Sequence, residues 1–145
     1  MSDLVSYNSE FLPEITISVV FSDSPQYERL HPLFQEYGYG FLVPNKNLVV
    51  IDGENIIDNF DSDVLKFIEA HEIAHIILGH DGPRNEDEEL DADLGAYLLL
   101  KQKGKEQSIE HLINNFEDRH GVEFNENLLK RVENQFSWYS EMEFL

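Results

Sequence analysis

The chain has 145 residues, of which 41% are hydrophobic, and it contains no cysteine. This length predicts a single domain over residues 1–145, and the lack of cysteine excludes disulfides, iron–sulfur clusters, a cysteine nucleophile and thiolate zinc sites. The chain carries 29 acidic and 10 basic residues, and its net charge of −19 repels nucleic-acid phosphates and anionic membranes. Because of this charge, we expect neither nucleic acid nor membrane as a partner. Because the chain has no cysteine, any metal ligands must be histidines and carboxylates.

The segment Met1–Glu10 lacks the basic stretch of a secretory signal, because it contains two acidic residues and no basic one. The apolar run Ile15–Phe21 is too short to span a bilayer and includes two hydroxyl side chains. A chain without cysteine also suits a reducing compartment. We therefore expect a soluble, cytoplasmic protein.

The first half of the chain is typical of short strands. Ile15–Phe21 is rich in β-branched residues and predicts a strand. Ser24–Tyr37 favours a helix that starts on a Ser-Pro pair, although Pro32 predicts a kink or a break. Tyr39–Val43 and Leu48–Ile51, joined by a Pro-Asn-Lys-Asn turn, predict an antiparallel hairpin.

The second half is typical of helices. After an Asp-Ser-Asp capping sequence, apolar residues recur densely over Val64–Leu78, which predicts a helix that is buried on more than one side and stops at Gly79. Further helices are predicted over Glu86–Lys103, Gln107–Arg119 and Asn125–Trp138. Apolar residues at helical spacing in the last two are expected in the core: Leu112, Phe116, Leu128, Leu129, Val132 and Phe136. The predicted fold class is α+β, with a small antiparallel or mixed sheet followed by helices.

Residues 71–80 read His-Glu-Ile-Ala-His-Ile-Ile-Leu-Gly-His within the most apolar predicted helix. His71 and His75 are four residues apart, so they lie on one face of a helix and can share a tetrahedral zinc ion. Glu72 borders the open coordination position and can act as general base on a metal-bound water. The small Ala74 between the histidines leaves room for a neighbouring element. The pattern predicts a zinc site with one position open to water.

The third ligand is expected on the next predicted helix, where Glu89 and Asp93 are four residues apart. Glu89 can bind the metal, and Asp93 can accept the ring N–H of His71 and so fix its tautomer. Glu86 shares a face with Glu89 and is an alternative ligand. The predicted metal ligands are therefore His71, His75 and Glu89, and Asp93 is predicted to orient His71.

Hydrolysis also needs a group that stabilises the developing oxyanion. Spacing selects none of the candidates, which are Tyr97, His80, Arg84, His111 and Tyr139. Tyr97 is preferred because it lies four residues after Asp93. On a continuing helix His80, five residues after His75, lies on a different face, where interaction with the helix dipole is the simpler role. The other histidines have no partner at ligand spacing, and surface or capping roles are expected for them: His31, His111 and His120.

The combination of His-Glu-x-x-His with Glu-x-x-x-Asp resembles the gluzincin metallopeptidases. The form Glu-x-x-Ala-Asp-x-x-Ala, from Glu89 to Ala96, is most similar to the HtpX/Ste24 peptidases and close to the ImmA/IrrE peptidases, which tend to carry Asn in place of Asp93. The resemblance covers Asp61–Leu100 and implies zinc, peptide hydrolysis and Glu72 as general base. Since the chain lacks the membrane segments of the first type and the accessory domains of the second, it resembles a minimal soluble gluzincin-like domain, closest in organisation to the ImmA/IrrE type.

The leading functional expectation is a zinc-dependent metallopeptidase that acts on a peptide or on a dedicated protein target. An alternative of another class is a zinc-containing interaction or regulatory module with little or no hydrolytic activity, whose acidic surface recognises a basic partner. A third is metal-dependent hydrolysis of a non-peptide amide. Leu48–Ile51 is predicted to form an exposed sheet edge, to which a peptide substrate could add as an extra strand.

Overall fold

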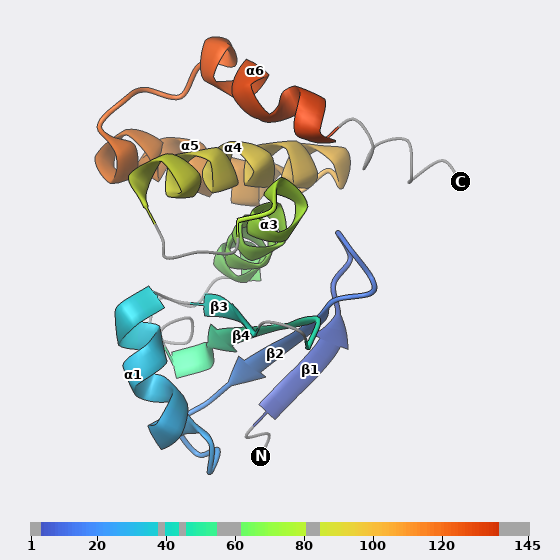
Figure 1. Cartoon of the computed structure of the whole chain (residues 1–145), viewed down its shortest axis with the longest axis vertical. Helices are drawn as coiled ribbons and strands as arrows, with labels where there is room; N and C mark the ends of the chain where they lie inside the picture. The colour runs from blue at the N-terminus through green and yellow to red at the C-terminus, as the bar shows by residue number, and fades with distance from the viewer. Residues whose placement is uncertain (1–3, 38–39, 44–45, 55–61, 81–84, 137–145) are drawn as a thin grey trace.

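The computed structural model describes residues 4–37, 40–43, 46–54, 62–80 and 85–136, and it confirms the predicted α+β class. A mixed four-stranded sheet forms the N-terminal part of the molecule, and a group of helices forms the C-terminal part (Figure 1). The elements in chain order are β1 Leu4–Asn8, β2 Thr16–Val20, α1 Tyr27–Tyr37, β3 Gly40–Val43, β4 Leu48–Asp52, α3 Ser62–Leu78, α4 Glu86–Gln102, α5 Glu106–His120, α6 Glu126–Glu133 and the 3-10 turn η1 Asn134–Phe136. None of the helices among these residues has both the length and the apolar character needed to cross a membrane.

The sheet has the strand order β1-β2-β4-β3. β1 and β2 are antiparallel, β2 and β4 are parallel, and β3 and β4 form the predicted antiparallel hairpin. β1 was not predicted, because three of its five residues are polar or amphipathic. The prediction that Leu48–Ile51 is an edge strand is wrong, because β4 is paired on both sides and cannot accept a further strand. Its continuous apolar run is typical of an interior strand buried on both faces.

α1 continues through Pro32, where a kink or a break was predicted. The helix begins at Tyr27, later than the predicted Ser24, and the proline lies on its exposed side. Its inner side carries the buried Phe34, which joins Phe41 and residues of the sheet in a small core cluster. Packing of this apolar side therefore holds the helix together although the proline removes one backbone hydrogen bond.

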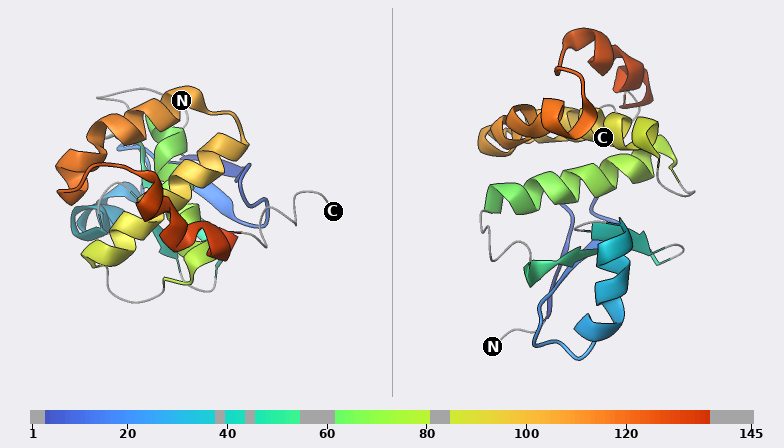
Figure 2. Two further views of the ribbon diagram at one scale, coloured as in Figure 1. Left: turned by 90° about the horizontal axis from the view of Figure 1, so that it is seen from above. Right: turned by 90° about the vertical axis from the view of Figure 1, so that its left-hand side faces the viewer.

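The two faces of the sheet pack against different helices. Val49 and Ile51 of β4 belong to the main core, which includes α3, whereas Val50 between them joins Phe34 of α1 in the smaller cluster. This division follows from the alternation of side chains along a strand. Figure 2 shows the resulting stack, in which α3 lies on the sheet, α4 and α5 lie on α3, and α6 lies on α4. α3 is thus buried on more than one side, as predicted.

The C-terminal helices form close to the predicted positions. α5 Glu106–His120 and α6 Glu126–Glu133 match the two predicted amphipathic segments, and the second of these continues as a 3-10 turn to Phe136. The predicted end of this helix at Trp138 lies outside the described residues. The predicted core residues are all buried except Leu128, which is half-buried and packs against the core: Leu112, Phe116, Leu129, Val132 and Phe136.

α3 and α4 approach each other closely where small residues meet. A Cβ atom on Gly95 of α4 would lie 2.9 Å from Cβ of Ala74 on α3 and 2.6 Å from the ring of Phe136. Real side chains essentially never show such distances, so the glycine allows α4 to lie this close to α3 without a shift. The space that Ala74 was predicted to leave is therefore filled by α4.

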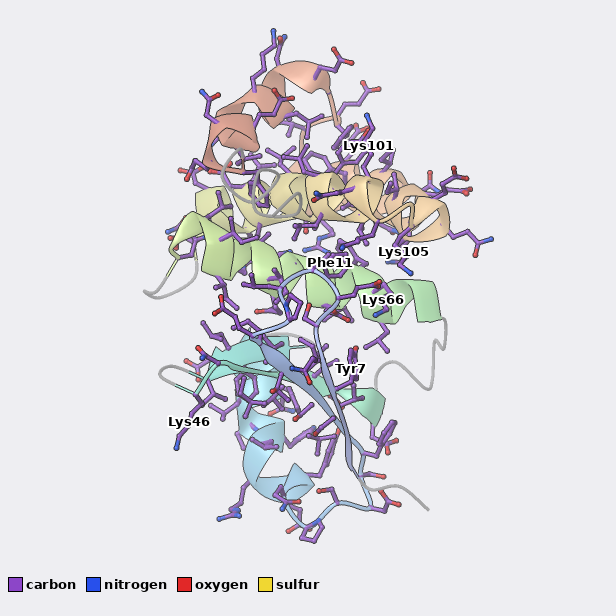
Figure 3. The ribbon with its side chains drawn as sticks, turned by 90° about the vertical axis from the view of Figure 1, so that its right-hand side faces the viewer. Tyr7, Phe11, Lys46, Lys66, Lys101 and Lys105 are labelled. Atoms are coloured by element: carbon purple, nitrogen blue, oxygen red, sulfur yellow. The ribbon has the colours of Figure 1, made fainter. Side chains whose placement is uncertain are left out.

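A buried carboxylate on α3 ties this helix to β1 and to the turn that follows β1. Glu69 is 0% exposed and accepts hydrogen bonds from the hydroxyls of Tyr7 at 2.9 Å and Ser9 at 2.7 Å. The ammonium of Lys66 lies 3.2 Å from the Glu69 carboxylate and 3.0 Å from that of Glu10. Figure 3 shows Tyr7 and Lys66 at this junction. These contacts, which we call the Glu69 network, fix the position of α3 on the sheet.

Candidate metal centre

α3 and α4 bring the three predicted metal ligands together. The Nε2 atoms of His71 and His75 are 3.2 Å apart. The carboxylate oxygens of Glu89 lie 3.0 Å from Nε2 of His71 and 3.2 Å from Nε2 of His75. Both histidines are buried and Glu89 is half-buried. The three side chains form a group that could hold a metal ion, which we call the metal centre.

The spacing of these atoms fits an ion of the size of zinc. A tetrahedral zinc ion with bonds of about 2.0–2.1 Å keeps its ligand atoms about 3.3–3.4 Å apart. The two Nε2 atoms are 3.2 Å apart, one oxygen of Glu89 lies 3.0 Å from His71 and the other lies 3.2 Å from His75, so each separation is close to this value. Two imidazoles and one carboxylate are also a donor set that catalytic zinc sites use, with the fourth position left for water or substrate. The residues of the metal centre therefore fit the predicted ion.

Each helix contributes its ligands through a short local pattern. The four-residue spacing of His71 and His75 places both rings on one face of α3. α4 begins at Glu86 after Asn85, whose side chain accepts the backbone N–H of Glu88 and so fixes the first turn. Glu89 follows in that turn and reaches the histidines. Glu86, the alternative ligand, is exposed. Among the described residues, the group that could hold a metal ion contains Glu89 and not Glu86.

Asp93 of α4 holds His71 from behind. Its Oδ1 atom lies 2.7 Å from Nδ1 of His71, so the predicted contact is present, and the carboxylate is fully buried. When Nδ1 of His71 donates to Asp93, the Nε2 lone pair is left to face the metal centre. Burial by itself lowers the pKa of His71, but the hydrogen bonds and charges of Asp93, Glu89 and Glu72 outweigh it and raise the pKa to about 9.

Side chains from α5 bind the second oxygen of Asp93. Nε2 of His120 lies 2.5 Å from Oδ2, and the guanidinium of Arg119 lies 3.3 Å from the same atom. Burial raises the pKa of Asp93, but the hydrogen bonds from His120 and His71 and the charge of Arg119 hold it well below its usual range. The expectation of a surface or capping role for His120 is wrong, because α5 packs its C-terminal end against α4. No spacing in the sequence signals this contact.

His80 contacts the second ligand histidine. α3 ends at Leu78, and Gly79 takes a left-handed conformation with φ of 76°, as a helix-stopping glycine does. The turn lets the backbone N–H of His80 donate to the carbonyl of His75 at 2.9 Å, and the Nδ1 atoms of the two rings lie 2.9 Å apart. The expectation that His80 lies on a different face is wrong, because the helix does not continue to this residue. The contact at Nδ1 places His80 behind His75, so a supporting role is favoured over the predicted oxyanion role.

Glu72, the predicted general base, is buried next to His71 in the chain. Its charge contributes to the raised pKa of His71, which places the two groups within electrostatic reach of each other. Its catalytic role stays a prediction.

The remaining oxyanion candidates lie in different surroundings. Tyr97 of α4 is half-buried, with its ring 4.7 Å from that of Phe124. The ring of His111 lies edge-on to that of Phe67 at 5.4 Å. Arg84 and Tyr139 lie outside the described residues. Their roles in oxyanion stabilisation stay predictions, with Tyr97 as the preferred residue.

The residues together define a class of site, a centre of two histidines and one carboxylate with a buried aspartate behind one of the histidines. Searches with the whole chain found no matching family model, curated protein or solved structure. The function must therefore be inferred from the sequence motifs and from the geometry of this centre.

Protonation of His71 gives the metal-free protein a pH-dependent stability. The pKa of His71 is raised from 6.5 to about 9 in the folded protein, so this group contributes stability that is fully present below pH 6.5 and is lost as the pH rises towards 9. Asp93 and Glu89 act on the ring through hydrogen bonds and Glu72 through its charge, while Nε2 of His75 lies 3.2 Å from Nε2 of His71. Metal binding needs the neutral ring, so the stability gained from zinc changes in the opposite direction. We expect the zinc-induced rise in melting temperature to grow from pH 6.5 to pH 9.

Thermal unfolding at a series of pH values, in EDTA and with excess zinc, measures both trends. The melting temperature in EDTA should fall over this range relative to that of His71→Asn, which lacks the titrating ring. A zinc-induced rise that shrinks as the pH increases would contradict the assignment of His71 as a ligand.

Proposed function

We propose that the metal centre binds zinc and that the protein is a metallopeptidase acting on a peptide or protein substrate. The observation that carries the proposal is the convergence of His71, His75 and Glu89 from two helices, with one ligand atom from each residue lying within 4.8 Å of the others. The motifs resemble those of the gluzincins, with a form most similar to the HtpX/Ste24 peptidases and close to the ImmA/IrrE peptidases, and they support the same function. The buried Glu72 beside the first ligand supplies the acid–base group that such a reaction needs.

The residues of the chain have separate parts in the proposed reaction. His71, His75 and Glu89 hold the ion, which when bound supplies Lewis acidity that lowers the pKa of water and polarises a carbonyl group. The carboxylate of Glu72 takes a proton from the attacking water and then delivers this proton to the leaving amine. Asp93 keeps the Nε2 lone pair of His71 directed at the ion through its hydrogen bond to Nδ1. Tyr97 is our candidate for stabilising the oxyanion.

Replacement of Glu72 by glutamine tests the proposed reaction. Glutamine has nearly the same shape but cannot accept the proton, so we expect kcat to fall by about 10²–10⁴-fold. Zinc content should stay that of the wild type, because Glu72 is not among the metal ligands. Cleavage of casein and of a peptide library by zinc-loaded protein, with metal content measured on the same samples, gives both quantities.

The matched control is Glu110→Gln, which makes the same change on an exposed position of α5 and should leave cleavage unchanged. Cleavage by Glu72→Gln at the wild-type rate would contradict the assigned role. A zinc-loaded wild type that cleaves neither casein nor any library peptide would contradict the proposed peptidase function.

The net charge of −19 favours one second candidate, a zinc-containing interaction module for a basic protein partner. In that case Glu72→Gln and the wild type would capture the same partner, and neither would cleave it. Salt would weaken the capture, because attraction between exposed charges is screened.

A further inference from the structure

The ring of His75 is engaged at both of its nitrogen atoms. Nε2 faces the metal centre, 3.2 Å from Nε2 of His71, and Nδ1 lies 2.9 Å from Nδ1 of His80. The His75 and His80 rings meet edge to face, with centroids 5.1 Å apart, and the side chain of His80 is only 15% exposed. Two imidazole nitrogens at this distance form a hydrogen bond in which one nitrogen donates and the other accepts.

The metal centre decides the direction of this hydrogen bond. If His75 binds a metal ion through Nε2, its one proton is on Nδ1, which must then donate to Nδ1 of His80. The opposite direction would place the proton of His75 on Nε2, where it would block the ion. His80 therefore supports metal binding when its Nδ1 acts as the acceptor.

The surroundings of His80 agree with the acceptor role. With Nδ1 accepting, the proton of His80 is on Nε2, and this atom lies 4.0 Å from a carboxylate oxygen of Glu88. The other Glu88 oxygen accepts a hydrogen bond from the side chain of Asn85 at 2.9 Å. At this distance the carboxylate acts through its charge, which favours a proton on Nε2 of His80. The order is thus Glu88, His80, His75 and the metal centre.

The backbone holds His80 in this position. Gly79, with φ of 76°, reverses the chain after α3, and the N–H groups of Gly79 and His80 donate to the carbonyls of Ile76 at 3.1 Å and His75 at 2.9 Å. These two bonds form the usual stop of a helix on a left-handed glycine. The ring is therefore returned to the last turn of α3 by backbone geometry as well as by its own contact.

We infer that His80 is a positioning residue for the metal ligand His75, whose Nδ1–H it accepts so that Nε2 is kept available for the ion. This inference rests on the metal centre proposed above and does not require hydrolysis. Both ligand histidines are then held from behind, His71 by Asp93 and His75 by His80.

Two substitutions of His80 distinguish the hydrogen bond that its Nδ1 atom accepts from the space that its side chain fills. In His80→Asn the amide oxygen takes nearly the place of Nδ1 and can accept the same proton, whereas His80→Leu fills the space without an acceptor. We expect zinc affinity, measured by competition with a chromogenic chelator, to fall by about 10–100-fold in His80→Leu and to be largely restored in His80→Asn. His31→Leu, an exposed position on α1, is the matched control and should bind zinc as the wild type does.

A second measurement needs no substitution. Long-range proton–nitrogen NMR spectra of the zinc-loaded wild type report which ring nitrogen carries the proton. Protons on Nδ1 of His75 and on Nε2 of His80 are expected, and a proton on Nδ1 of His80 would overturn the inference even if His80→Leu failed to fold. Equal zinc affinity in the wild type and in His80→Leu would overturn it while leaving the metal centre intact. A wild type that binds no zinc would instead refute the metal centre itself.

Discussion

Replacement of Asp93 by alanine should lower the free energy of unfolding of the metal-free protein by about 3–5 kcal/mol and weaken zinc binding by about 10–100-fold. The Asp93 carboxylate is fully buried and lies 2.7 Å from His71, 2.5 Å from His120 and 3.3 Å from Arg119. Its removal leaves the ring N–H of His71 and the groups from α5 without their common acceptor, and the side chains of His71 and His120 are each only 7% exposed. The loss therefore combines a broken buried charge cluster with a ligand histidine that is no longer oriented.

Urea unfolding in EDTA measures the first quantity, and chelator competition measures the second. Asp93→Asn keeps an oxygen for His71 but turns an amide N–H₂ towards His120 and Arg119, so its effect should be intermediate in both assays. Glu110→Ala, at an exposed position of α5, is the control and should unfold and bind zinc as the wild type does. An Asp93→Ala variant as stable as Glu110→Ala would contradict the role given to Asp93.

Replacement of Glu69 by alanine should also lower the free energy of unfolding by about 3–5 kcal/mol. The side chain is 0% exposed and is held by Tyr7 at 2.9 Å, Ser9 at 2.7 Å and Lys66 at 3.2 Å. The substitution removes the acceptor of two hydroxyl hydrogen bonds and leaves a cavity between α3 and the sheet. Glu69 is not among the metal ligands, so zinc affinity in the fraction that remains folded should change far less than stability does.

Denaturant unfolding of Glu69→Ala, Tyr7→Phe and the double variant tests whether the Glu69 network acts as a unit. The double variant should lose less than the sum of the two single losses, because both substitutions remove the same hydrogen bond. Glu110→Ala on the exposed side of α5 is the control and should unfold as the wild type does. A Glu69→Ala variant as stable as this control would show that the Glu69 network contributes nothing to the fold.

Features set by neighbours along the chain could be predicted from the sequence. A four-residue spacing on a helix places two side chains on one face, which is why His71 pairs with His75 and why Glu89 lies near Asp93 on α4. The hairpin of β3 and β4 follows from its turn residues in the same way. The stop of α3 at Gly79 follows from the conformation that glycine permits.

Features set by packing between distant segments could not be predicted. Glu69 sits in an apolar helical pattern, and its partner Tyr7 is 62 residues away in the chain. His120 reaches Asp93 only because α5 lies along α4, and no local pattern encodes that arrangement. The interior position of β4 could have been predicted in part, because its unbroken apolar run is typical of a strand with neighbours on both sides.

The proposed function depends on α3 and α4 together holding one metal ion, and the metal content of purified protein measures this most directly. After saturation with zinc and extensive dialysis, elemental analysis of the wild type should give an equimolar amount of zinc, and His75→Ala should give none. A folded wild type that retains no zinc, or a His75→Ala variant that retains as much as the wild type, would contradict it.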